Sequence, residues 1–186
     1  MNGQENSRDR GLNEATQQRL GNISLLLLDV DGVLTDGRIV YTGLETESKY
    51  FNVKDGLGLK MLMRAGIGAG IVTARSSSAL TRRCRELGIV HLYDDVPDKG
   101  AVLPDILLET GLDSPDRVAF IGDDLPDIPL LKKVGLPLSV ADARPEVQAL
   151  AALVTTAAGG QGAVREVCEA ILRAQDKWAE ALAHYE

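Results

Sequence analysis

Two aspartates, Asp29 and Asp31, are separated by a single residue directly after an apolar run at residues 23–28. A short continuous apolar run is typical of a central strand in a parallel sheet, buried on both faces. Side chains two residues apart on an extended chain point to the same side. Carboxyl ends of strands are also where open α/β sheets bind ligands. Because two close carboxylates repel each other without a cation or a shared proton, the pair predicts a divalent metal site with a reactive aspartate.

Further polar residues follow other predicted strands in a regular order. Thr73 ends the next core strand, and Lys99 opens a predicted helix after a short acidic loop. An aspartate cluster, Asp123, Asp124 and Asp127, follows the apolar run at residues 118–121. Each feature is a weak signal by itself. Their order, each at the exit of a strand or the start of a helix, predicts one shared site.

Composition limits the class of protein. The 186 residues are 45% hydrophobic and 4% aromatic, with a formal net charge of -7, which suits one domain with a sizeable aliphatic core. The acidic balance argues against nucleic acid or a membrane surface as the main partner. Cys84 and Cys168 are too few and too far apart for a disulfide framework or a zinc site. No apolar stretch reaches the ~18 residues of a membrane span, so we expect a cytoplasmic protein.

The remaining pattern alternates strands and helices. Residues 1–22 are polar and predict a tail or a short surface helix, with the ordered domain covering 23–186. Residues 38–53 predict a β-hairpin around Gly43 that serves as a small flap. Asp55 is expected to cap the next helix. The alternation predicts an α/β fold with a doubly wound, Rossmann-like parallel sheet in three αβα layers. Expected strands are 67–72, 89–92, 117–121, 136–140 and 153–155, and expected helices are 76–87, 99–110, 125–134, 145–150 and 162–182.

The ordered motifs resemble those of the haloacid dehalogenase-like phosphatases. The resemblance implies that Asp29 is a nucleophile that forms an aspartyl-phosphate and that Asp31 is the general acid and base. It implies a Mg²⁺ ion held by Asp29, Asp123 and the backbone carbonyl of Asp31, with oxygen ligands that suit this ion. Thr73 and Lys99 would stabilise the phosphoryl oxygens. Asp124 and Asp127 either support the metal ligands, bind the ion through a water molecule, or cap a helix N-terminus.

Longer segments resemble one family within that class, the 3-deoxy-D-manno-octulosonate 8-phosphate phosphatases. The matching stretches are DVDGVLTDGRI, FNVKDGLGLK, ARSSSALTRRCRELGI with HLY, IGDDLPD and GGQGAVREVCE. The resemblance implies a magnesium-dependent homotetramer without a cap domain that acts on a sugar-acid phosphate in lipopolysaccharide biosynthesis. A neighbouring subunit would complete the active site. The implied substrate contacts are Asp31, Asn52, Val53, Lys54, Asp55, Gly56, Lys60, Arg75, Arg83 and Lys99.

Some positions depart from the family pattern. Lys54, Lys60 and Gln161 stand where the family usually has Arg, and Ala74 where it usually has Gly. Lysine keeps the charge but lacks the bidentate fork that fits a carboxylate. A phosphatase of a nine-carbon keto-sugar acid 9-phosphate is therefore an alternative. A receiver-like phosphoacceptor module is a second alternative. Such domains, however, lack an acid two residues after the nucleophile, the position that Asp31 occupies in this chain.

Overall fold

A six-stranded parallel sheet forms the centre of the molecule. The computed structural model describes residues 13–42 and 47–185. In space the strands follow the order β5-β4-β1-β6-β7-β8, and every neighbouring pair is parallel. Their bounds are β1 Leu25–Leu28, β4 Gly68–Val72, β5 His91–Tyr93, β6 Val118–Gly122, β7 Leu136–Ser139 and β8 Leu153–Val154. The predicted doubly wound sheet is confirmed.

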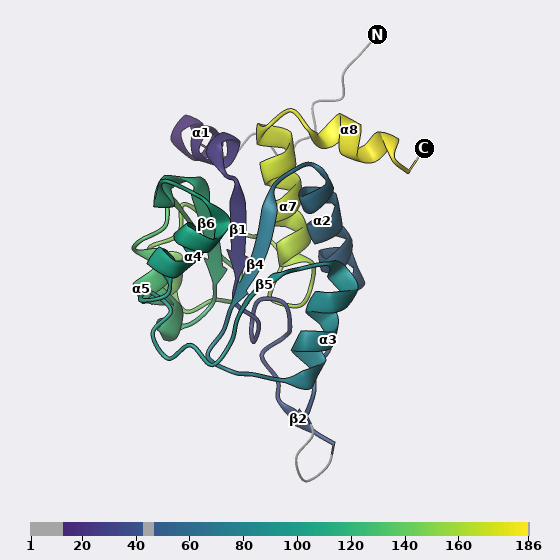
Figure 1. Cartoon of the computed structure of the whole chain (residues 1–186), viewed down its shortest axis with the longest axis vertical. Helices are drawn as coiled ribbons and strands as arrows, with labels where there is room; N and C mark the ends of the chain where they lie inside the picture. Colours follow the sequence, from purple (N-terminus) through teal and green to yellow (C-terminus); the bar gives the residue numbers. More distant parts are fainter. Residues whose placement is uncertain (1–12, 43–46, 186) are drawn as a thin grey trace.

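Helices cover both faces of this sheet, as Figure 1 shows, with α4 and α5 on one side and α2, α3 and α7 on the other. The predicted three-layer arrangement is therefore also confirmed. The α-helices are α1 Glu14–Asn22, α2 Val53–Arg64, α3 Ser78–Leu87, α4 Leu103–Thr110, α5 Ile128–Leu131, α6 Pro145–Gln148, α7 Ala163–Ala174 and α8 Trp178–Ala183. Short 3₁₀ turns lie at η2 Pro115–Arg117 and η3 Leu125–Asp127.

A small antiparallel hairpin projects from the end of the molecule that lies opposite α8 (Figure 1). It pairs β2 Val40–Tyr41 with β3 Glu47–Ser48. A hairpin is confirmed within the predicted residues 38–53, but its strands are much shorter than that range indicates. The turn expected around Gly43 lies outside the described residues. Val53, expected in the second strand, instead begins α2.

Several element boundaries differ from the sequence predictions. Asn52, not Asp55, caps α2, because its side chain accepts a hydrogen bond from the Lys54 backbone N. Lys99 does not open a helix, since α4 starts at Leu103. The long helix expected over residues 162–182 is two helices, α7 and α8, interrupted near Asp176, which has a φ of 57°.

The folded domain also begins earlier than Ile23, the start that the sequence predicts. The α1 helix is capped by the side chain of Asn13, and its Leu20 is fully buried. Gln175 donates hydrogen bonds to the backbone oxygens of Leu20 and Ile23. These contacts attach α1 to the end of α7, so the folded region starts at least as early as Glu14.

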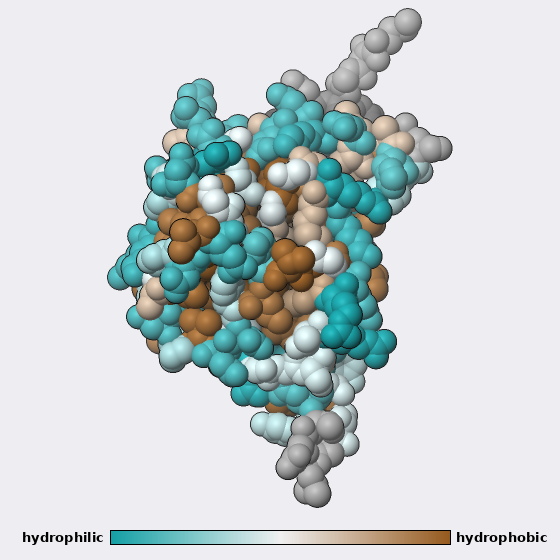
Figure 2. Space-filling view, viewed as in Figure 1, coloured by the Kyte–Doolittle hydropathy of each residue, from teal (hydrophilic) through white to brown (hydrophobic). Residues whose placement is uncertain are grey.

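The core is aliphatic, as the composition indicates. All four leucines of β1 are buried, and Phe120 is the largest fully buried side chain. In the described part of the chain, no helix is long and apolar enough to cross a membrane. Figure 2 shows hydrophobic patches on one face, separated by hydrophilic residues.

Candidate active site

The strand register brings the predicted residues together. Leu28 of β1 pairs with Ile71 of β4 on one side and with Ile121 of β6 on the other. Beyond this row, the three strands end at the same edge of the sheet, where Asp29, Thr73 and Asp123 follow them. Parallel strands that end in register place the residues after them at one ligand-binding edge.

A buried lysine joins two of the aspartates. Lys99 Nζ donates to Asp29 Oδ1 at 2.6 Å and to Asp127 Oδ1 at 2.5 Å. Lys99 is 3% exposed and Asp127 is 1% exposed, so these ion pairs are shielded from water. Burial alone would lower the pKa of Lys99, but the charges of Asp29 and Asp127 raise it above its ordinary value. The lysine therefore stays charged within the site.

Three carboxylates converge where a metal ion would fit. One oxygen from each of Asp29, Asp123 and Asp127 lies within 4.8 Å of the others. The Gly32 backbone lies directly against the Asp123 carboxylate, since a Cβ at Gly32 would be 2.1 Å from Asp123 Oδ2. Gly32 also has a φ of 100°, which favours glycine. An all-oxygen, carboxylate-rich set suits a hard divalent ion such as Mg²⁺.

Crowding changes the acidity of these groups. Burial and the neighbouring Asp127 raise the pKa of Asp29 to about 6, although Lys99 opposes the shift. Burial, with Asp29 and Asp127 next in importance, raises the pKa of Asp123 to about 8. Both shifts reflect carboxylates that lack enough positive charge nearby. A divalent cation would relieve this repulsion.

The three aspartates of the cluster, Asp123, Asp124 and Asp127, make different contacts. Asp127 Oδ2 accepts hydrogen bonds from the backbone N of Asp123 at 2.8 Å and of Asp124 at 3.2 Å. It therefore closes the turn and contacts Lys99 at the same time. Asp124 is exposed and caps η3, because its Oδ1 accepts from the Leu125 backbone N. The N-cap alternative applies to Asp124, whereas Asp127 faces the acidic site.

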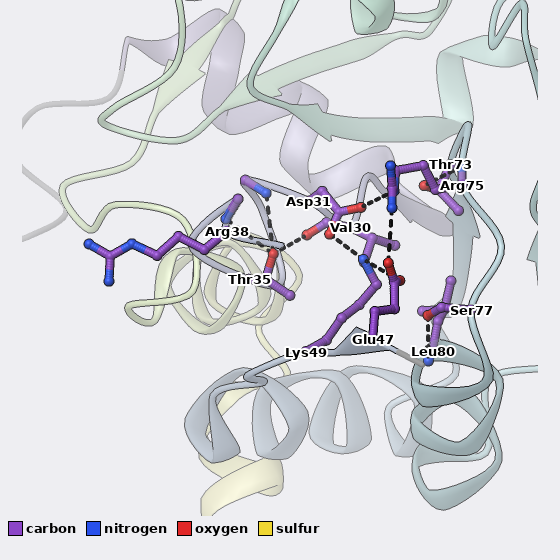
Figure 3. Close-up of polar contacts among 12 residues, drawn as sticks. Val30, Asp31, Thr35, Arg38, Glu47, Lys49, Thr73, Arg75, Ser77 and Leu80 are labelled. Carbon is purple, nitrogen blue, oxygen red and sulfur yellow. Dashed lines mark hydrogen bonds and ion pairs between the residues drawn. The ribbon is translucent and has the colours of Figure 1, made fainter. Parts of the chain in front are cut away.

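Asp31 lies in a separate charged network, which Figure 3 shows. Its Oδ1 accepts a hydrogen bond from Lys49, and its Oδ2 is 3.7 Å from Arg75 Nε. Glu47 bridges the two cations, at 2.9 Å from Arg75 and 3.4 Å from Lys49. Thr73 lies nearby, buried, and its Oγ1 accepts from the Arg75 backbone N at 3.4 Å.

Sequence reasoning missed Lys49 and Glu47. Both belong to the segment where the hairpin returns to the body of the molecule. A signal was present, because residues 47 and 49 of an extended segment place their side chains on the same face. An acid and a base on one face of a flap beside a predicted phosphate site indicate a charge network.

The predicted substrate-binding residues separate into two groups. Some serve as contacts within the protein: Asn52 Nδ2 donates to the Gly160 backbone O at 3.1 Å, and Asp55 Oδ1 accepts from the Arg165 backbone N at 2.8 Å. Arg83 donates to the Asn52 backbone O and lies against Gly56. Val53 and Lys54 are exposed at the start of α2, and Lys60 is half-buried further along it. For both groups of residues, a part in substrate binding stays a prediction.

The glycine-rich segment before α7 packs on the loop that carries Asp31. A Cβ at Gly159 would lie 1.7 Å from the Gly32 backbone O. The Gly160 backbone N donates to the Val33 O at 2.9 Å. The close approach of two backbones therefore explains glycine at this position.

Comparison with known proteins defines the class and then the family. Residues 90–167 match the haloacid dehalogenase-like hydrolase family. The 3-deoxy-D-manno-octulosonate 8-phosphate phosphatase KdsC of Salmonella typhi is 47% identical over 160 residues, covering 86% of this chain and 85% of that protein. The chain therefore belongs to the 3-deoxy-D-manno-octulosonate 8-phosphate phosphatase family of haloacid dehalogenase-like hydrolases.

Solved structures agree with this assignment. The crystal structure of 3-deoxy-D-manno-octulosonate 8-phosphate phosphatase from Yersinia pestis has a TM-score of 0.86 and 46% identity, covering 89% of each chain. The enzyme of the same name from Moraxella catarrhalis, solved with a magnesium ion, a phosphate ion and a KDO molecule, has a TM-score of 0.88 and 41% identity. That match covers 92% of this chain and 98% of the Moraxella chain.

Proposed function

We propose that the protein is a Mg²⁺-dependent phosphatase that converts 3-deoxy-D-manno-octulosonate 8-phosphate to 3-deoxy-D-manno-octulosonate and phosphate. The observation that carries the proposal is the arrangement of Asp29 and Asp31, which lie at one strand end and are each paired with a different lysine. Two carboxylates with different partners can perform different tasks. Lipopolysaccharide biosynthesis is the pathway in which such a reaction belongs.

Asp29 is the nucleophile in this proposal. Its carboxylate attacks phosphorus and forms an aspartyl-phosphate, while Asp31 donates a proton to the leaving sugar oxygen. Water then hydrolyses the intermediate with Asp31 acting as the base. Lys99 and Thr73 stabilise the charge on the phosphoryl oxygens.

Asp29, Asp123 and the backbone carbonyl of Asp31 would hold Mg²⁺, with Asp127 beside them. When bound, the ion screens the repulsion between the anionic nucleophile and the anionic substrate. The fit rests on the carboxylate oxygens that converge within 4.8 Å and on the raised pKa of Asp123.

The remaining cations suit a substrate that carries both a phosphate and a carboxylate. Arg75 is half-exposed beside Asp31, with a side chain that is 44% exposed. Lys54 and Lys60 come from α2, the helix that follows the hairpin in the chain, and Arg83 comes from α3. Cations placed locally can bind an anion within an acidic protein.

A neighbouring subunit is proposed to complete the site within a homotetramer. Large apolar or aromatic side chains are exposed around the hairpin and the start of α2: Tyr41 is 74%, Tyr50 70% and Val53 76% exposed. Apolar groups gathered on one surface favour a protein contact. Sedimentation analysis tests this directly, and a monomer at assay concentration would contradict it.

Phosphate release tests the enzymatic function. Purified protein with Mg²⁺ is assayed with the eight-carbon acid 8-phosphate, nine-carbon acid 9-phosphates and hexose phosphates. A clear kcat/KM preference for the eight-carbon substrate is expected. A preference for a nine-carbon acid would retain the chemistry but change the substrate, and no turnover of any of these compounds would refute the proposal.

A further inference from the structure

Lys49 is a buried cation in the short hairpin that adjoins the active site. Its side chain is 3% exposed, yet it follows a strand of two residues at the edge of the molecule. An ammonium group is strongly hydrated, so burying it is unfavourable unless anions replace the lost water. Asp31 and Glu47 supply those anions. The hairpin therefore brings its lysine specifically to the carboxylate of Asp31.

The Asp31 carboxylate depends on this contact for its orientation. Within residues 13–42 and 47–185, Lys49 is the one hydrogen-bond donor to Asp31, and Oδ2 is buried without a hydrogen bond. Arg75 approaches Oδ2 at 3.7 Å, too far for a hydrogen bond. Asp127, in contrast, accepts hydrogen bonds from the backbone N of Asp123 and Asp124 as well as from Lys99.

The four charged groups form a balanced set that connects three segments. Glu47 and Lys49 come from the hairpin, Asp31 from the loop after β1, and Arg75 from the segment after β4. When Asp31 is ionised, two acids and two bases carry no net charge together. Because each ion has an opposite partner, the set can hold one geometry in a partly buried place, as the close-up in Figure 3 illustrates.

We propose that Lys49 is a positioning residue that aims the Asp31 carboxyl at the leaving-group oxygen. The inference rests on the proposed phosphatase function and adds a role for the hairpin within one chain. In the first step, a bond forms between an Asp29 oxygen and phosphorus. The bond from phosphorus to the sugar oxygen breaks, and the proton of Asp31 passes to that oxygen. Misplacing Asp31 slows this proton transfer and leaves the attack by Asp29 intact.

Two leaving groups distinguish this role from a general loss of activity. An alkyl leaving group, as in the sugar-acid phosphate or a simple sugar phosphate, requires protonation, whereas p-nitrophenolate does not. Lys49→Met should lower kcat/KM for the alkyl phosphate about 10- to 100-fold but change kcat/KM for p-nitrophenyl phosphate much less, because kcat/KM reports formation of the aspartyl-phosphate and excludes its later hydrolysis. Because both substrates are measured on one sample, the ratio is independent of the fraction of folded enzyme.

A double variant tests whether Lys49 acts through Asp31. Asp31→Asn alone should show the same selective loss in kcat/KM, and adding Lys49→Met should lower kcat/KM for the alkyl phosphate little further, because residues acting as a unit are not additive. Lys132→Met removes the same charge from an exposed position at the end of α5 and serves as the control. It should leave the ratio unchanged.

Three results would overturn the inference. These are an equal loss of kcat/KM on both substrates, an unchanged kcat/KM on both, and a full additional loss in the double variant. Failure of the proposed function would look different. In that case the wild-type protein would not hydrolyse the sugar-acid phosphate, while the ratio between a simple alkyl phosphate and p-nitrophenyl phosphate could still be measured.

Discussion

Replacement of Asp55 tests whether this residue binds substrate or supports the fold. Asp55 is 1% exposed, and its Oδ1 accepts a hydrogen bond from the backbone N of Arg165 in the first turn of α7. An acceptor at a helix N-terminus satisfies free N–H groups and interacts favourably with the helix dipole. The geometry therefore predicts a loss of stability rather than a loss of substrate affinity.

The expected size follows from the contacts. Asp55→Ala removes the acceptor and leaves the partly buried N–H of Arg165 without this partner, which costs about 2 kcal/mol. In a chain of 186 residues, this corresponds to a fall in Tm of about 4–8 °C. Burial raises the pKa of Asp55 above its ordinary value, although the N–H of Arg165 opposes the shift. Because an asparagine amide oxygen can still accept this hydrogen bond, Asp55→Asn should cost only about 1 kcal/mol.

Thermal unfolding and steady-state kinetics on the same preparations measure both effects. Asp113→Asn changes an exposed aspartate and is the matched control for charge. Both Asp55 variants should keep the wild-type KM for the sugar-acid phosphate at temperatures well below their Tm. An unchanged Tm with a KM raised tenfold would refute the structural role and assign Asp55 to the substrate.

Three further predictions concern the metal site and its supporting loop. Asp29→Asn should abolish turnover without unfolding the protein, and circular dichroism with phosphate release checks both; a wild-type rate would exclude Asp29 as the nucleophile. The pKa of Asp123 is raised from 3.8 to about 8, chiefly by burial, so the folded metal-free protein favours its protonated form and loses stability as pH rises between these values. Mg²⁺ should therefore raise Tm more at pH 8 than at pH 5.5, with EDTA-treated protein as the reference. An equal rise in Tm at both pH values would contradict the coupling between Mg²⁺ binding and deprotonation of Asp123. Gly159→Ala should lower stability by about 1–3 kcal/mol, because its Cβ would lie 1.7 Å from the Gly32 backbone O; an unchanged denaturation midpoint would show that the loop yields easily.

Local sequence rules correctly predicted where three of the candidate residues lie in the fold. Asp29, Thr73 and Asp123 each follow an apolar strand, and parallel strands in register end at one edge. Lys99 was placed wrongly at the start of a helix, although its position in the chain was identified. The Asp98 side chain accepts from the backbone N of Gly100 and Ala101, which forms a turn before α4. Pro104, favoured in a first helical turn, was an available signal for the later start.

The assignment of Asp55 shows the limit of local rules. Asn52 and Asp55 stand three residues apart before an apolar pattern, and either fits a helix start. Asn52 caps α2, while Asp55 accepts from α7, 110 positions further along the chain. Such a partner depends on how two helices pack, which no local pattern contains.

The sequence by itself determined the fold class, the family and the acidic strand ends, because these follow from apolar periodicity and from motifs a few residues long. The tertiary structure decided which charges meet. The hairpin, separate from the main sheet, brings Lys49 and Glu47 to Asp31, and Lys99 reaches Asp29 across 70 positions. Ion pairs between distant segments depend on the packing of whole layers, so only the folded chain assigns each aspartate its own lysine.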